Sequence, residues 1–224
     1  MDSTDPEQRE GRVARRQRRN REALIRAAQV VMTEKGVDGA TMLEIAERAD
    51  VGAGTVYNYF KSKDDLAIAV LETLMHDLAL RIKQATKGFD DPAEVYAFGL
   101  RAVLETATSD ERWRQLLNRS EVIADTIFRV MGPFATRDLR LAIDAGRFRL
   151  DDPALVWRLA THAIIGVSLA VTTGTLPSDT LDETVVILLC MTGMGVEGAR
   201  ELAGRPRPRI ATASRREAVD KAAN

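Results

Sequence analysis

Residues 41–66 read TMLEIAERADVGAGTVYNYFKSKDDL, and the rest of the chain is organised around this stretch. Thr41 is followed three residues later by Glu44, the reciprocal pattern that satisfies the free amides at a helix start. Apolar residues then recur at helical spacing until turn formers interrupt them at 50–54. The pattern resumes, and a second capping pattern starts at Ser62. The stretch therefore predicts a helix, a tight turn, a second helix and the start of a third.

The second of these helices has a surface suited to DNA. Two short helices joined by a tight turn can set the second helix into a major groove. From Val51 to Lys63 there is no acidic residue. Hydroxyls and amines suit phosphate oxygens, Asn can pair with an adenine edge, and glycine allows close backbone approach. The candidate DNA-binding residues are Gly52, Gly54, Thr55, Tyr57, Asn58, Tyr59, Lys61 and Lys63. A helical hairpin with a polar outer face is the alternative.

Residues 21–66 also resemble the DNA-binding domain of the tetracycline-repressor (TetR) family. The matching residues are Ala27-Ala28, Gly36, Thr41, Ile45-Ala46, Ala49, Val51, Gly54-Thr55, Tyr57, Tyr59-Phe60, Ser62-Lys63 and Leu66. The resemblance implies phosphate contacts from Thr41, Thr55, Tyr57, Tyr59 and Lys63. It also implies that a recognition helix near Ala53 to Asn58 reads bases, so Thr41 and Ala53 join the candidate DNA-binding residues.

Two residues of the turn depart from the family pattern. Asp50 stands where relatives usually carry Gly, and Gly52 stands where they carry Ser. Asp tolerates a left-handed turn better than most residues, so we expect the turn to form. Gly52 caps a helix less well than Ser by a few tenths of a kcal/mol and lacks a hydroxyl for phosphate. Ala53 is shorter than the base-reading side chains of many relatives, so their operators do not predict the operator of this chain.

Composition and pattern divide the chain into four segments. A surplus of Arg precedes the motif, because eight Arg face only Glu10 and Glu22 between Arg9 and Arg26. A segment with so little apolar content is expected to be irregular. The expected segments are a flexible basic arm at 1–20, a helix-turn-helix domain at 21–66 with its motif at about 41–60, a larger helical domain at 67–203, and a flexible tail at 204–224.

The basic arm has a DNA-binding interpretation because it adjoins the motif. It could follow phosphates or enter the neighbouring minor groove, with a strong dependence on salt. A solvated leader, a targeting peptide and a surface helix are the alternatives. A secretory signal is excluded, because no apolar segment follows the charges.

The remaining pattern is helical, so the predicted fold class is all-α. The first helix should run from about 22 to 35 and stop at Gly36, and another should run from Lys63 to about Lys87. Pro133 should kink or divide the helix that contains it. Further helical periodicity occurs at 93–107, 110–119, 121–145, 153–173 and 181–203.

The helices at 153–173 and 181–203 are the most apolar. A membrane span needs about 20 apolar residues, and Arg158 and His162 interrupt the first helix, so we expect no membrane segment. The helices could form a buried core pair, or they could pair across a two-fold axis in a homodimer. The resemblance favours the dimer, which predicts an inverted-repeat operator. We expect a polar substitution at Leu188 to weaken such a dimer.

The resemblance further implies a small-molecule effector enclosed by the middle helices. The candidate lining combines bulky apolar side chains with one polar group, which suits a hydrophobic effector. Each of these residues could instead belong to the core, and His162 could be an interior histidine with a hydrogen bond. The candidate lining residues are Trp113, Leu117, Phe128, Met131, Phe134, Trp157 and His162.

Catalysis has little support in the sequence. Cys190 is the only cysteine, so no internal disulfide is possible, which fits a reducing cytoplasm. His76 and His162 lack ligand spacing with cysteines or carboxylates, so we expect no metal and no cofactor. No phosphate loop, nucleophile elbow or zinc-protease motif is present.

Three functions remain possible. The first is a dimeric, ligand-responsive transcriptional repressor of the cytoplasm. The second is a DNA-binding protein that is indifferent to sequence, and the third is a small-molecule enzyme or carrier with a vestigial DNA-binding unit. The density of the motif favours the first.

Overall fold

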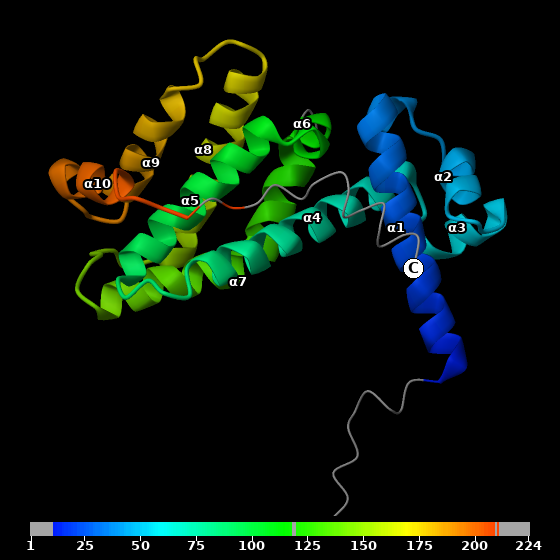
Figure 1. Cartoon of the computed structure of the whole chain (residues 1–224), viewed down its shortest axis with the longest axis horizontal. Coiled ribbons are helices and arrows are strands. Elements are labelled where there is room, and N and C mark those ends of the chain that lie inside the picture. Colours follow the sequence, from blue (N-terminus) through cyan, green and yellow to red (C-terminus); the bar gives the residue numbers. More distant parts are fainter. Residues whose placement is uncertain (1–10, 118–119, 209, 211–224) are drawn as a thin grey trace, which may run out of the picture. The chain divides into compact units, whose positions relative to one another are not determined.

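The computed structural model describes residues 11–117, 120–208 and 210, without the side chains of 115–122 (Figure 1). Every regular element in these described residues is an α-helix, which confirms the all-α prediction. Contacts divide the chain into two compact units, Met1–Val70 and Leu71–Asn224. The sequence pattern places this boundary slightly earlier, after Leu66.

The N-terminal unit is built from three helices and the first turns of a fourth. Thr41 caps the second helix, and both halves of its capping box with Glu44 are present. Each of the four helices contributes a side chain with no exposed surface, namely Leu24, Ile45, Val56 and Leu66. The helices are α1 (Arg12–Gly39), α2 (Met42–Arg48), α3 (Ala53–Tyr59) and α4 (Lys63–Ala85).

Helix α1 is longer at both ends than the sequence pattern indicated. It begins at Arg12, so the expectation of an irregular arm is wrong for residues 12–20. Residues 1–10 of that arm lie outside the described part of the chain. Gly36, the expected stop, has φ 73° and ψ 166°, a backbone conformation open essentially to glycine alone. The chain then makes one more helical turn, and Ala40 N donates to Gly36 O (3.2 Å).

The C-terminal unit consists of the later part of α4 and six further helices. Helix α5 packs against α6, α7, α8, α9 and α10, so it lies at the centre of the unit (Figure 1). Side-chain oxygens of Asp91 and Asp152 accept backbone N–H groups at the starts of α5 and α8, each of which has Pro in its first turn. The helices are α5 (Pro92–Ser109), α6 (Glu111–Leu117), α7 (Ser120–Asp144), α8 (Pro153–Thr172), α9 (Thr180–Cys190) and α10 (Val196–Ala203).

The breaks between helices follow the prediction only in part. Pro133 was expected to kink or divide its helix, and α7 continues through it undivided. In contrast, the single helix expected at 181–203 is two helices, because the chain turns at Gly193, where φ is 79°. Arg149 N donates to Thr192 O (2.8 Å), and a Cβ at Gly193 would lie 2.3 Å from Arg149 O. The close approach of the 146–152 segment therefore requires glycine at this position.

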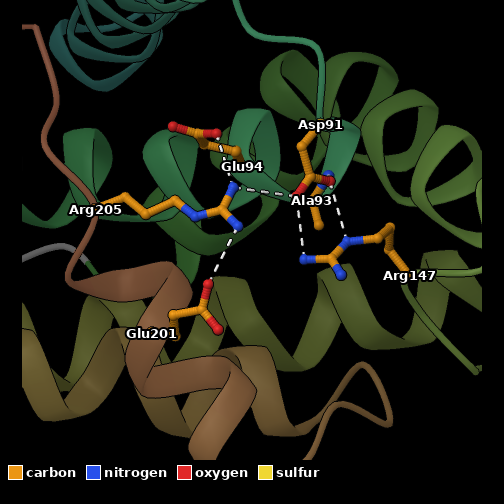
Figure 2. Close-up of polar contacts among 6 residues, drawn as sticks. All are labelled: Asp91, Ala93, Glu94, Arg147, Glu201 and Arg205. Atoms are coloured by element: carbon orange, nitrogen blue, oxygen red, sulfur yellow. Dashed lines mark hydrogen bonds and ion pairs between the residues drawn. The ribbon is translucent and has the colours of Figure 1, made fainter.

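A polar cluster joins three separate parts of the C-terminal unit (Figure 2). Arg205 contacts Asp91 (3.3 Å) and Glu94 (3.0 Å) at the start of α5 and Glu201 (3.4 Å) on α10. Arg147, which follows α7, contacts the same Asp91 carboxylate (3.0 Å). The start of the expected flexible tail is therefore bonded to the unit, whereas residues 209 and 211–224 lie outside the described part of the chain.

Helix α8 is long and apolar enough to cross a membrane, with a mean hydropathy of 1.6. The prediction that no helix is long and apolar enough for this is therefore wrong by length and composition. One face of α8 packs within the unit through Trp157, Ile164 and Ile165. A buried helix of a folded protein passes the same test of length and composition, so the property does not by itself indicate a membrane.

Candidate nucleic-acid interface and effector cavity

The turn between α2 and α3 has the hydrogen bonds of a helix stop followed at once by a helix start. Asp50 N donates to Glu47 O (3.2 Å), and Val51 N donates to Ala46 O (3.1 Å), as in a Schellman motif. Asp50 has φ 54°, the left-handed conformation expected for this residue. Gly52 then caps α3 without a side-chain hydrogen bond. The two helices thus form a helix-turn-helix.

Helix α3 has one buried and one exposed face. Val56 is completely buried and fixes the helix against the core of the unit. The exposed side carries Ala53, Gly54, Tyr57 and Asn58, and the Tyr57 side chain is 59% exposed. Tyr57 and Asn58 are adjacent, so a hydroxyl and an amide are presented together with no acid in the helix. Of the other candidates, Thr55, Tyr59 and Lys63 are half-buried, and Thr41, Gly52 and Lys61 are exposed.

Two of the candidate phosphate ligands already make internal hydrogen bonds. Lys63 Nζ donates to Asp38 O (2.7 Å) and to Ala40 O (3.1 Å), which leaves one of its three N–H donors. Thr41 Oγ1 accepts from Glu44 N (3.2 Å) and donates to a Glu44 carboxylate oxygen (3.0 Å). The Glu44 carboxylate also binds Lys35, and this bond, followed by those from Thr41, lowers its pKa. The capping role of Thr41 was expected from the sequence, whereas the internal hydrogen bonds of Lys63 were not.

A cavity lies inside the C-terminal unit between α4, α5, α7 and α8. The cavity is small, with a volume of about 40 Å³, and its walls are mainly apolar. This volume is well below the roughly 300–1,000 Å³ of small-molecule sites, so a ligand would need the surrounding side chains to move apart. Three of the seven predicted effector residues line it, namely Met131, Phe134 and Trp157.

The other predicted effector residues are not part of this cavity lining. Trp113 is buried elsewhere in the unit, and the side chain of Leu117 lies outside the described part of the chain. The guanidinium of Arg158 lies over the Phe128 ring, 3.5 Å from its centroid. His162 is exposed, and its Nδ1 is 2.8 Å from Arg158 O, so its assignment as the polar group of the site is wrong for this cavity.

Polar groups that the sequence analysis missed lie in the cavity wall. Tyr96 Oη and Trp157 Nε1 are buried and have no hydrogen-bond partner among the described residues. Burial, with a smaller effect from Asp138, raises the pKa of Tyr96, so its hydroxyl keeps its proton. The Asp138 carboxyl is also buried and its pKa is raised by burial, although Arg137 (2.7 Å) opposes this shift. The cavity thus offers two unused N–H or O–H donors and one carboxyl group.

Asp138 could have been found from the sequence. Met131, Phe134 and Asp138 follow one another at helical spacing, so an acid continues an apolar stripe of α7. Tyr96 had no such signal. It lies in a nearly continuous apolar stretch of α5, where a tyrosine in the core looks the same.

A second apolar surface is formed by the outer sides of α8 and α9. Leu155 and Leu159 on α8 are 54% and 50% exposed, and Ile187 on α9 is 56% exposed. His162 continues the α8 stripe, because residues 155, 159 and 162 lie on one helical face. Leu188, the interface residue chosen from the sequence, is instead buried inside the chain (2% exposed), so Ile187 is the residue that faces outward.

The helix-turn-helix and the separate helical unit together are typical of a DNA-binding transcriptional regulator. The family model described as "Bacterial regulatory proteins, tetR family" matches residues 24–70, and the model described as "Tetracyclin repressor-like, C-terminal domain" matches residues 91–205. The chain therefore belongs to the tetracycline-repressor family.

Solved structures and curated proteins agree with this assignment. The crystal structure of RolR in complex with resorcinol is 32% identical, covers 88% of this chain and 100% of the RolR chain, and has a TM-score of 0.80. The regulator BetI of Cronobacter sakazakii is 26% identical over 64% of this chain and 73% of its own length. The transcriptional activator FasR of Mycolicibacterium smegmatis is 28% identical over 51% of each chain.

The matches to several other curated relatives are shorter. A helix-turn-helix regulator of Staphylococcus aureus is matched over 46% of its length, and YvdT of Bacillus subtilis over 36%. The operators and effectors of such relatives therefore do not transfer to this chain.

Proposed function

We propose that the chain is a homodimeric repressor that binds an inverted-repeat operator and is released from it by a small molecule. The observation that carries this proposal is the exposed, acid-free face of α3, where Tyr57 and Asn58 stand beside the backbone of Gly54. A side-chain amide can read an adenine edge, while hydroxyls and backbone amides hold phosphates.

The DNA-binding part is tested by selecting bound duplexes from a random pool at fixed salt. We expect one enriched half-site, repeated in inverted orientation. Tyr57→Ala should weaken binding to all duplexes alike, whereas Asn58→Ala should change the preferred base at one position by about 1–3 kcal/mol. Absence of any enrichment would instead favour a sequence-indifferent DNA-binding protein. The Arg-rich start of α1 is the feature that supports a sequence-indifferent DNA-binding protein as the second candidate.

The dimer is proposed from the uncovered apolar face of α8 and α9. Large aliphatic side chains that are half exposed on adjacent helices suit a self-complementary contact across a two-fold axis. Such a dimer would present two α3 helices about 34 Å apart, which corresponds to one turn of DNA. This distance is the physical reason for expecting an inverted repeat.

The effector is proposed to be a small, neutral, hydroxylated aromatic molecule held in the cavity. A ligand oxygen can accept from Tyr96 Oη or Trp157 Nε1, and a ligand hydroxyl can donate to the Asp138 carboxylate. Apolar side chains such as Met131 and Phe134 would contact the ring. The resorcinol in the RolR complex has this chemistry. An anionic ligand would bring its charge close to Asp138 and fits less well.

Resorcinol itself is a suitable probe. It should raise the unfolding temperature of the protein and lower its affinity for the selected operator. Tyr96→Phe and Asp138→Asn should each reduce both effects, and the exposed Asp151→Asn serves as the matched control. If neither resorcinol nor phenol shifts the unfolding temperature, the proposed ligand class is wrong, and the DNA-binding proposal remains. FasR is a transcriptional activator, so a reporter assay must decide between repression and activation.

A further inference from the structure

The first turns of α1 carry a dense set of exposed arginines. Among residues 12–19, the backbone is helical and nearly all side chains are exposed. Figure 1 shows these dark-blue turns extending beyond α2 and α3, with no other helix of the N-terminal unit beside them. The arginines of this segment are Arg12, Arg15, Arg16, Arg18 and Arg19.

These turns are an unfavourable place for positive charge. The amino end of a helix carries a partial positive charge, which acids stabilise and cations destabilise. The first turn of α1 contains no acid, and Gly11 provides no side-chain cap. Arginines three and four residues apart, such as Arg12, Arg16 and Arg19, also repel one another along the helix. Among the described residues of α1, the first acid is Glu22, which lies 3.9 Å from both Arg18 and Arg26.

The extension continues a helix that is anchored in the core of the N-terminal unit. Leu24 and Ala28 on the next turns of α1 are fully buried in the core of the same unit. The guanidinium of Arg21 lies over the ring of Phe60, 5.4 Å from its centroid. Phe60 is the C-cap of α3, and its N–H donates to Val56 O (2.9 Å). The carboxyl end of the basic segment is therefore followed directly by a residue that contacts the end of α3, the helix that is proposed to read bases.

We propose that the helical segment Arg12–Asn20 is a second DNA-binding element, which contacts phosphates outside the half-site read by α3. This inference rests on the proposed function of α3 and adds a separate surface to it. Phosphates close to the segment would remove the repulsion between its arginines, so the helix should be more stable on DNA than in free solution. Arg12, Arg15, Arg16 and Arg19 lie within one side of the helix and could follow one strand.

DNA fits this surface better than a lipid membrane does. A helix that lies on a membrane needs an apolar face beside its basic one. Among residues 12–20, only Val13 and Ala14 are apolar, and they are adjacent rather than aligned along one face. The segment thus has charge without an apolar stripe, as expected for a partner whose surface consists of phosphates.

The experiment compares two variants that lose the same charge. The test variant is R12Q/R15Q/R16Q/R19Q, in which glutamine keeps a similar helix propensity. The control is R114Q/R140Q/R149Q/R200Q, which removes four exposed arginines of the C-terminal unit. Binding is measured against salt concentration on two duplexes, one that ends at the selected half-sites and one with long flanks.

On the flanked duplex, the test variant should bind more weakly than the control. The slope of log affinity against log salt should fall by about 0.9 for each phosphate that the variant no longer neutralises. On the short duplex, the difference between the two variants should largely disappear. Circular dichroism should show a gain of helix when the wild-type chain binds the flanked duplex, and a smaller gain for the test variant.

The inference is overturned if the test variant keeps the wild-type salt slope on flanked DNA, or if the control loses as much affinity. Equal losses on the two duplexes would also overturn it, as would loss of binding to vesicles of anionic lipid without loss of binding to DNA. These results are distinguishable from failure of the proposed function, in which the wild-type chain selects no duplex at all.

Discussion

Gly193 cannot carry a side chain without a change in the surrounding backbone. A Cβ at this position would lie 2.3 Å from Arg149 O, and its φ of 79° favours glycine. We expect Gly193→Ala to lower the free energy of unfolding by about 2 kcal/mol or more, because both strain and overlap contribute. Urea unfolding measures this change. Gly88→Ala is the control, because nothing lies within 4 Å of its Cβ position, and the variant should unfold like the wild type.

The Asp138 carboxyl should make stability depend on pH. Burial is the largest cause of its shift and raises its pKa above the usual 3.8, so ionisation is less favourable in the folded than in the unfolded chain. Below pH 3.8 the carboxyl group is protonated in both the folded and the unfolded chain, so it does not lower the free energy of unfolding. As the pH rises through the folded-state pKa, the wild type should lose stability relative to Asp138→Asn. Thermal unfolding of both proteins at a series of pH values measures this difference, and a constant difference would contradict the burial argument.

Two residues with an unusual backbone conformation were predicted correctly from the sequence. The left-handed Asp50 and the non-helical Gly36 were both expected from the turn pattern, and both have positive φ. Tyr96 could not be predicted, because its role depends on which helices surround it. A sequence shows which residues are neighbours along one helix. The Tyr96 hydroxyl is unpaired because the described residues of the three other helices around the cavity place no hydrogen-bond partner beside it.

Asp91 connects several elements at once. It caps α5 through Ala93 N (3.0 Å), and its carboxylate also binds Arg147 and Arg205. Asp91→Ala should therefore lower the free energy of unfolding by about 1–2 kcal/mol, since the cap contributes about 1 kcal/mol and partly exposed ion pairs contribute less. Chemical denaturation measures the loss. The neighbouring exposed Asp90→Ala is the matched control, and an equal loss there would show that general charge rather than the cluster is responsible.

Most helices were predictable because their caps and apolar periodicity are local. Two exceptions have different causes. The break between α9 and α10 is shaped by the backbone of Arg149 from another part of the chain, so 181–203 looked like one helix. Helix α1 begins at Arg12 despite a charge pattern that disfavours a helix, so low apolar content predicted an irregular arm instead.

The proposed dimer should depend on Ile187. Ile187→Lys places a charge on the uncovered face of α9 without entering the core, so the folded chain should remain but dissociate at concentrations where the wild type is dimeric. Sedimentation or light scattering measures the mass. Leu141→Lys is the control, because Leu141 on α7 is similarly exposed at 48%. A variant that keeps the wild-type mass would locate the contact elsewhere.

It was harder to predict which side of each apolar helix is exposed than to predict where the helices lie in the sequence. The sequence identified the apolar helices at 153–173 and 181–203, but it placed Leu188 rather than Ile187 on the outside. In a helix that is apolar on nearly all sides, the periodicity does not say which side meets the rest of the chain.

The two hydrogen bonds from Lys63 to Asp38 O and Ala40 O connect the first turn of α4 to the residues before α2. The same helix later contributes Ala79, Ile82 and Lys83 to the cavity wall. Lys63→Met should leave the affinity for resorcinol, measured by calorimetry, unchanged. It should reduce the ratio between the operator affinities measured without and with resorcinol. The reason is that coupling between two sites is a free energy, which residues between the sites can transmit. An unchanged ratio would mean that ligand and DNA communicate by a route that bypasses this lysine.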